Sequence, residues 1–138
     1  MKKVILALML AAGSVGFAHA DADVVKDMVS AYKKGKNNAM KEEEETCWSA
    51  FKPGDSDTAF GYCATHSFVG HLIADMVAEK GGKKLTGYWA ENTMQERVAK
   101  HALRLKMSEK QIEKLIKEYV EDSAEEIVKA LQKSGYTY

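Results

Sequence analysis

Cys47 and Cys63 are the only two cysteines in the 138-residue chain, and they constrain its fold more than any other feature. Each lies in a stretch whose apolar residues recur at helical spacing, and the turn-forming segment 52–57 separates the two stretches. In an oxidising compartment, such a pair joins neighbouring helices through a disulfide. Closing a loop of this size should stabilise the fold by about 3 kcal/mol in the chain-entropy model. We therefore predict a structural disulfide, Cys47–Cys63.

The two sulfurs have two alternative uses, a metal site and a redox-active pair. A zinc site could combine both cysteines with His66 and His71, but these histidines are five residues apart. On a regular helix they point about 140° apart, so both cannot face one ion. A redox-active pair usually has the Cys-X-X-Cys arrangement, which this chain lacks. We expect no metal ligands and no cofactor.

The first twenty residues have the pattern of a signal peptide. Two lysines are followed by the apolar run 4–17, and Ala18 and Ala20 supply the small residues that a signal peptidase reads. The run is too short for stable membrane insertion to be expected. The sequence predicts cleavage after Ala20, export to the periplasm, and a single domain over 21–138.

Charge argues against nucleic-acid binding. Removing the leader takes away two lysines and no acid, which leaves 18 basic and 20 acidic residues. Nucleic-acid-binding proteins usually show a strong basic excess. The four consecutive glutamates 42–45 are interpreted as a solvated helix face.

The apolar periodicity predicts an all-α fold, a small disulfide-stapled bundle of five or six helices. The only proline is Pro53. Gly35 should weaken the helical structure between a first and a second helix. A third helix is expected over 58–79 and a fourth over 86–105. Ser108 and Gln111 fit a capping box that opens a fifth helix. Ser123 and Glu126 could cap a sixth, or the fifth could continue through them.

Small residues are unusually frequent in the third expected helix. Gly61, Ala64, Ser67, Gly70 and Ala74 would let a neighbouring backbone or side chain approach closely. Tight core packing is the favoured interpretation, and a groove for a partner or ligand is the alternative.

No catalytic residue is predicted. The chain contains no Gly-X-Ser-X-Gly elbow, zinc-protease motif or phosphate-binding loop. Its carboxylates, such as Asp75, Glu79 and Glu91, stand in no distinctive sequence setting. We expect a protein that is not an enzyme.

The stretch 47–77 resembles a known family. Cys47 on one helix is followed by Gly61, Tyr62, Cys63 and Gly70 on the next, and this pattern is similar to that of exported immunity proteins of type VI secretion systems, of the amidase-immunity group. In that family the Gly-Tyr pair does not precede the cysteine as it does here. The resemblance implies a periplasmic inhibitor that binds a secreted cell-wall amidase or a related toxin.

A second resemblance covers 103–119. Met107, Ser108 and Gln111 are similar to the Leu-Thr-X-X-Gln repeat of small periplasmic stress chaperones, although the chain has no clear second copy of it. The resemblance implies an alternative function as a stress or acid chaperone. A capping box explains Ser108 and Gln111 equally well.

A protein-binding module needs surface residues that reach its partner. The loop 52–57 beside the disulfide and the connector 81–89 are the segments expected to project. We predict partner contacts at Asp55, Asp57, Lys83 and Trp89. A homodimer is also compatible with the sequence.

Overall fold

The computed structural model describes residues 18–54 and 57–138, and this part of the chain is helical with no strand. The predicted leader 1–20 lies almost entirely outside the described residues, so its cleavage stays a prediction. The elements in chain order are α2 (Ala18–Ala50), α3 (Asp57–Lys80), the 3-10 helix η1 (Gly87–Trp89), α4 (Glu91–Arg104), α5 (Glu109–Ile116), the π-helical segment η2 (Lys117–Glu121) and α6 (Ala124–Lys133).

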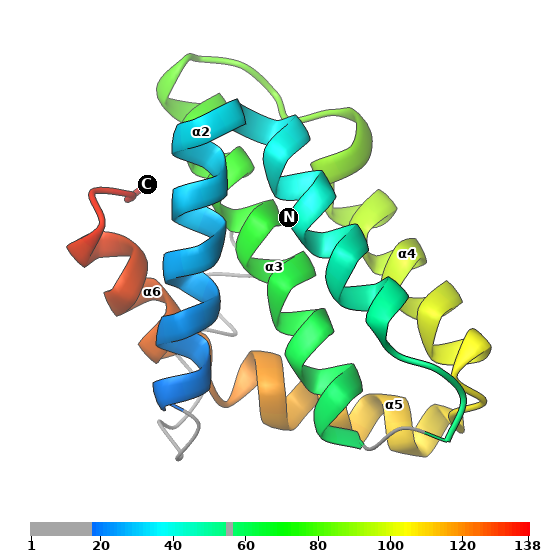
Figure 1. Ribbon diagram of the computed structural model, residues 1–138. Coiled ribbons are helices and arrows are strands. Elements are labelled where there is room, and N and C mark those ends of the chain that lie inside the picture. Colours follow the sequence, from blue (N-terminus) through cyan, green and yellow to red (C-terminus); the bar gives the residue numbers. More distant parts are fainter. Residues whose placement is uncertain (1–17, 55–56) are drawn as a thin grey trace.

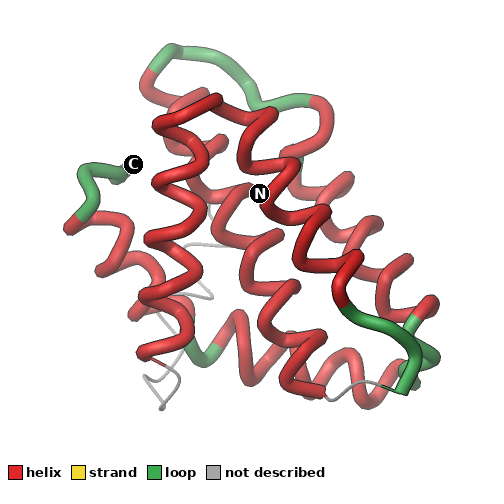
Figure 2. The backbone as a smooth tube through the Cα atoms, in the orientation of Figure 1, coloured by secondary structure: helices red, strands yellow, loops and turns green. Residues whose placement is uncertain are grey.

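Helix α2 folds back on itself (Figures 1 and 2). Gly35 and Lys36 leave helical geometry, and Lys36 has a φ of 61°, which is uncommon outside glycine. The second half of α2 then returns alongside the first, with α3 between the two halves (Figure 1). The break expected at Gly35 is therefore confirmed, and it lets one long element cover α3 from two sides.

The core lies around α3, which packs against α2 and α4, while α6 packs against α2. Trp48 and Phe60 pack edge to face there, with ring centroids 5.6 Å apart. Burial of such aromatic and aliphatic side chains is the main favourable term in folding. The largest fully buried apolar side chains are Trp48, Phe60, Met28, Met40, Leu72, Ile73, Met76, Ile127 and Leu131.

The predicted all-α class and the Cys47–Cys63 disulfide are confirmed. The disulfide joins the second half of α2 to α3, and the two Cα atoms lie 5.6 Å apart, within the usual range of roughly 4.4–6.8 Å. Neither cysteine is free. The two longest helices are thus covalently linked beside the turn that connects them.

Glycines on α3 make room for aromatic rings. A Cβ atom on Gly61 would lie 2.4 Å from the ring of Tyr119, and one on Gly70 would lie 2.3 Å from the indole of Trp89. Both approaches are far closer than packed atoms allow. At these two positions the small residues serve core packing, as the favoured interpretation holds.

The predicted count of five or six helices is slightly off. Only α2, α3, α4 and α6 have ten or more residues among the described helices. The fourth helix begins at Glu91 rather than 86, because 87–89 forms the 3-10 helix η1.

The two predicted helix caps have different outcomes. The capping box at Ser108 and Gln111 is present and opens α5. The one at Ser123 is absent, because the Ser123 hydroxyl donates to the Glu118 carbonyl of η2 instead.

The four glutamates do not form a uniformly solvated face. Glu42, Glu43 and Glu45 are exposed, but Glu44 is fully buried. Successive residues on a helix are rotated by about 100°, so four in a row cannot all face solvent when one side of the helix is packed. Within residues 18–54 and 57–138, none of the helices combines the length and the apolar character that a membrane span needs.

Candidate functional site

A polar cavity opens near the C-terminal end of α3. His71, Asp75 and Glu79 follow one another at four-residue spacing and share one side of this helix. They line a cavity of about 590 Å³ together with the connector residues 82–85 and the start of α4 at 90–92. We call this the His71 cavity.

The ring of His71 is buried and held in one orientation. Its Nδ1–H donates to the carbonyl oxygen of Trp89 at 2.7 Å, and only 3% of the residue is exposed. Because a carbonyl can only accept, the neutral ring carries its lone pair on Nε2. That atom is buried and has no hydrogen-bond partner within the described chain.

Glu91, at the first turn of α4, contributes a second unpaired acceptor. Its Oε1 accepts a hydrogen bond from Gln95, but its buried Oε2 has no partner in the described part of the chain. A buried acceptor without a partner costs roughly 1–3 kcal/mol. No other buried side-chain nitrogen or oxygen in the described residues lacks a partner. Both residues line the His71 cavity, and Glu91 also borders a second cavity between α3, α4, α5 and η2. A hydrogen-bond donor bound in the His71 cavity would therefore meet two residues that each have an unpaired acceptor.

The electrostatic character of the cavity is acidic. The Tyr138 hydroxyl at the C-terminus donates to Asp75 Oδ2 at 2.9 Å. Burial raises the pKa of Tyr138, and the charges of Asp75, Glu79 and Glu91 raise it further. The same negative potential would favour a positively charged ligand group.

The connector between α3 and α4 forms one wall of the cavity. Gly82 and Gly87 adopt positive φ angles of 67° and 78°, which turn the chain sharply at both ends of the connector. Lys83 and Lys84 are exposed and line the cavity. The site therefore combines an acidic interior with a basic edge.

The structure separates the predicted contact residues into two groups. Lys83 lies at the cavity, beyond the C-terminal end of α3. Asp57 lies at the N-terminal end of this helix, which is roughly 35 Å long, and accepts a hydrogen bond from Gln111. Asp55 lies outside the described residues. Because of this separation, one small interface cannot include both Lys83 and Asp57.

Trp89 is buried and supports the connector from inside. Only 2% of the residue is exposed, and its Nε1–H donates to the carbonyl of Asn37 at the fold-back of α2. A partner could reach the Trp89 side chain only by displacing the connector. Its backbone carbonyl is the acceptor that orients His71.

A buried ion pair fixes the connector and α4 to α2. Arg97 donates to both carboxylate oxygens of Glu44, at 2.9 and 3.1 Å, and also to the carbonyl of Tyr88. Ser67 donates to the same carboxylate, and Trp48 donates to Ser67. This chain of hydrogen bonds satisfies the buried charge, as a folded protein requires.

Sequence reasoning missed His71 as part of a site. Asp75, Glu79 and Glu91 are carboxylates in no distinctive sequence setting, and nothing in the sequence marks them as members of one cavity. The available signal was the spacing of His71, Asp75 and Glu79 along one helix face. The contribution of Glu91 depends on how the connector folds, which local spacing does not reveal.

Comparisons with protein-family models, with curated proteins and with solved structures found no match for this chain.

Proposed function

We propose that this chain is an exported protein-binding module that holds a basic side chain of its partner in the His71 cavity. The observation that carries the proposal is the pair of buried, unpaired acceptors, His71 Nε2 and Glu91 Oε2, among the residues that line one acidic cavity. A lysine ammonium or arginine guanidinium supplies several donors and a positive charge. Either group would satisfy both features of the cavity.

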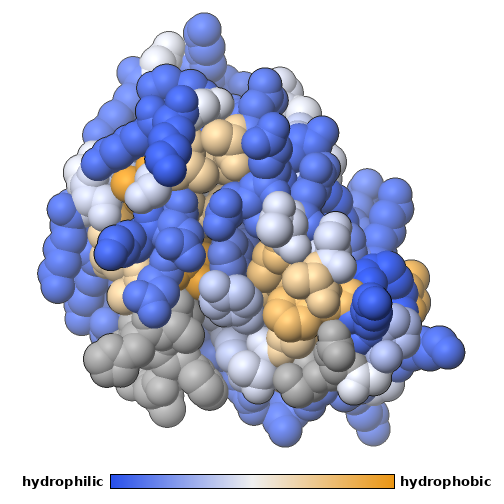
Figure 3. Space-filling view, in the orientation of Figure 1, coloured by the Kyte–Doolittle hydropathy of each residue, from blue (hydrophilic) through white to orange (hydrophobic). Residues whose placement is uncertain are grey.

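The scaffold suits binding to a folded protein. The disulfide and the Glu44–Arg97 pair hold α2, α3 and α4 together, so the cavity requires little ordering when a partner arrives. Hydrophilic residues predominate on the face shown in Figure 3, with the largest apolar area near the C-terminal end of α2 and smaller apolar areas elsewhere on this face. On such a surface, a buried basic anchor surrounded by polar contacts is a reasonable basis for specificity.

The partner we propose is a secreted enzyme that cleaves the cell wall, an amidase or a related toxin, which the module neutralises in the periplasm. The resemblance of Cys47, Gly61, Tyr62, Cys63 and Gly70 to immunity proteins supports this choice. An oxidising compartment is also where a structural disulfide persists.

The proposal is tested by inhibition. Partners are captured from periplasmic extracts on immobilised protein, identified by mass spectrometry, purified, and assayed for peptidoglycan hydrolysis. We expect a captured hydrolase to lose most of its activity when one equivalent of the protein is added. Recovery of no hydrolase, or of one that stays fully active in the complex, would refute the inhibitor function.

One observation favours the alternative, an acid or stress chaperone. A second cavity, of about 280 Å³, is almost entirely apolar and lies among α3, α4, α5 and η2, with Phe68, Val98 and Ile116 in its wall. Nearby on α4, the ring of His101 stacks on Trp48, with ring centroids 4.4 Å apart. Opening the bundle at low pH would expose this apolar surface.

Acid should destabilise the protein through His101. Burial lowers the pKa of His101 from 6.5 to about 4, and the charges of Arg104 and Arg97 contribute to the decrease. Between about pH 4 and pH 6.5, His101 binds a proton in the unfolded chain but not in the folded chain. The contribution of His101 to stability is therefore fully present above pH 6.5 and is lost as the pH falls toward 4. The ring is partly exposed, so we expect a loss of about 1–2 kcal/mol.

Urea unfolding at pH 7 and pH 4.5 measures this loss, and His101→Gln should reduce it. A chaperone would also bind an apolar dye strongly at pH 4.5. A bundle that binds no more dye at pH 4.5 than at pH 7 would rule out the acid-chaperone alternative.

A further inference from the structure

We propose that Asp27, Glu43 and His66 form a binding site for a divalent first-row transition metal ion of the zinc class. The site lies apart from the His71 cavity and does not depend on the function proposed above. It also differs from the cysteine–histidine arrangement considered from sequence, since both cysteines are in the disulfide.

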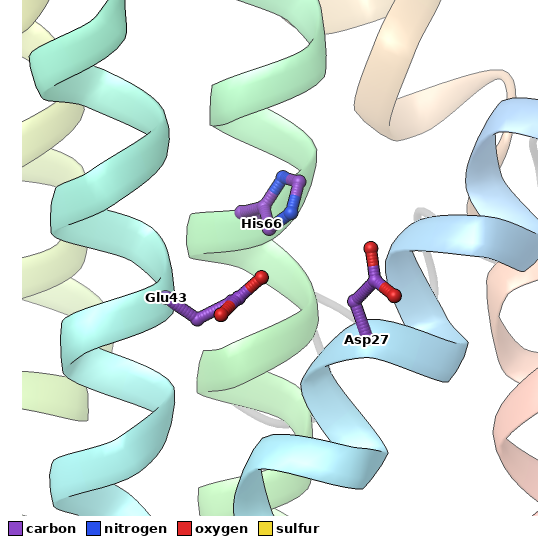
Figure 4. Close-up of side chains that lie close together, drawn as sticks. All are labelled: Asp27, Glu43 and His66. Atoms are coloured by element: carbon purple, nitrogen blue, oxygen red, sulfur yellow. The ribbon is translucent and has the colours of Figure 1, made fainter.

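The three side chains come from three helical segments. Asp27 lies on the first half of α2, Glu43 on its returning half, and His66 on α3 between them (Figure 4). One ligand atom from each residue lies within 4.8 Å of the other two. These residues are 16 and 23 positions apart in sequence, so the fold-back of α2 at Gly35 is what brings them together.

His66 is oriented as a metal ligand usually is. Its Nδ1–H donates to the carbonyl of Tyr62 at 2.9 Å, and the residue is only 2% exposed. The neutral ring then carries its lone pair on Nε2. Unlike His71 Nε2, this atom keeps some exposed surface, and no hydrogen bond or ion pair is found for it in the described structure. Metal-binding histidines commonly donate their other ring nitrogen to a backbone carbonyl in this way.

The two carboxylates are free to bind a cation. Asp27 and Glu43 are exposed, and neither side chain forms an ion pair or hydrogen bond in the part of the chain described. The ligand atoms therefore sit in a negative potential that a cation would neutralise.

The donor set indicates the class of metal. Imidazole favours zinc, iron, copper or nickel over magnesium and calcium, and carboxylates complete many zinc sites. Ligand atoms around a tetrahedral zinc lie about 3.4 Å apart, because the bonds are about 2.0–2.2 Å long. The exposed Asp27 and Glu43 side chains need to move inward by only about 1 Å to reach this spacing. Three protein ligands leave a fourth position for water or another ligand.

Zinc titration followed by calorimetry tests the site. The protein is purified from the periplasm without a tag, stripped with a chelator, and kept with its disulfide intact. We expect one zinc ion per chain, and at least tenfold weaker binding for Asp27→Asn and for Glu43→Gln. Glu42→Gln removes the same charge one residue away from Glu43 and should change the affinity less than twofold.

Two further readouts separate metal binding from loss of fold. Zinc should raise the midpoint of thermal unfolding of the wild type and of Glu42→Gln, but not of Glu43→Gln, whose exposed position should leave the apo protein folded. Cobalt should give visible absorption bands in the wild type that Glu43→Gln lacks. The proposal is overturned if the wild type binds no zinc at millimolar concentration, or if Asp27→Asn and Glu43→Gln bind as tightly as the wild type.

Discussion

Replacing Cys47 and Cys63 together with alanine should lower the free energy of unfolding by about 3 kcal/mol or more. The disulfide closes a loop with a sequence separation of 16 and so restricts the conformations of the unfolded chain. Without the disulfide, the unfolded chain has more conformational entropy and is favoured over the folded state. Both cysteines are also part of the buried core, so removing their sulfur atoms removes van der Waals contacts there. Typical domains have only about 5–15 kcal/mol of net stability, so the variant should unfold at much lower urea concentration.

Reduction of the wild type separates the covalent effect from the packing effect. Urea unfolding with and without a reducing agent should show a loss of similar size in the wild type, and no change in the double-alanine variant. If reduction left the wild-type unfolding curve unchanged, the disulfide would not be a major source of stability.

The second large effect is expected at Arg97. Changing Arg97 to methionine leaves the Glu44 carboxylate buried without a counter-charge, because the Glu44 side chain has no exposed surface. Breaking a buried ion pair from one side typically costs about 3–5 kcal/mol. The change also removes the donor to the Tyr88 carbonyl, so the connector beside the His71 cavity should loosen.

A double variant supplies the test of this explanation. Glu44→Met with Arg97→Met leaves no charge buried, and it should lose less stability than Arg97→Met alone. Lys100→Met, an exposed change on the same helix, should stay within about 0.5 kcal/mol of the wild type. A loss below about 1 kcal/mol for Arg97→Met would show that Glu44 is not held by this pair.

Local sequence signals predicted the elements that depend on local chemistry. The helical periodicity, the break at Gly35 and the capping box at Ser108 involve residues within a few positions of one another. The disulfide was predictable because only one pairing of two cysteines exists. The absent cap at Ser123 shows the limit of such signals. The Ser123 hydroxyl donates to the Glu118 carbonyl in η2 and accepts no hydrogen bond from the first turn of α6.

The parts that sequence reasoning missed depend on contacts between distant segments. Glu44 seemed a surface residue because its partner, Arg97, lies 53 residues away on α4. The His71 cavity requires α3, the connector and α4 to meet, and the Asp27–Glu43–His66 cluster requires α2 to fold back. No short pattern in the chain encodes either arrangement.

The claim that the His71 cavity is the binding site is tested most directly by quantitative capture from periplasmic extract. Wild type, Glu91→Gln and Glu96→Gln are immobilised at equal density, and the captured partner is measured by mass spectrometry. Glu96 is an exposed glutamate on the same helix, so its variant controls for loss of charge. The account predicts at least tenfold less partner on Glu91→Gln and an unchanged amount on Glu96→Gln. Equal capture by all three proteins, or capture of no partner by the wild type, would contradict it.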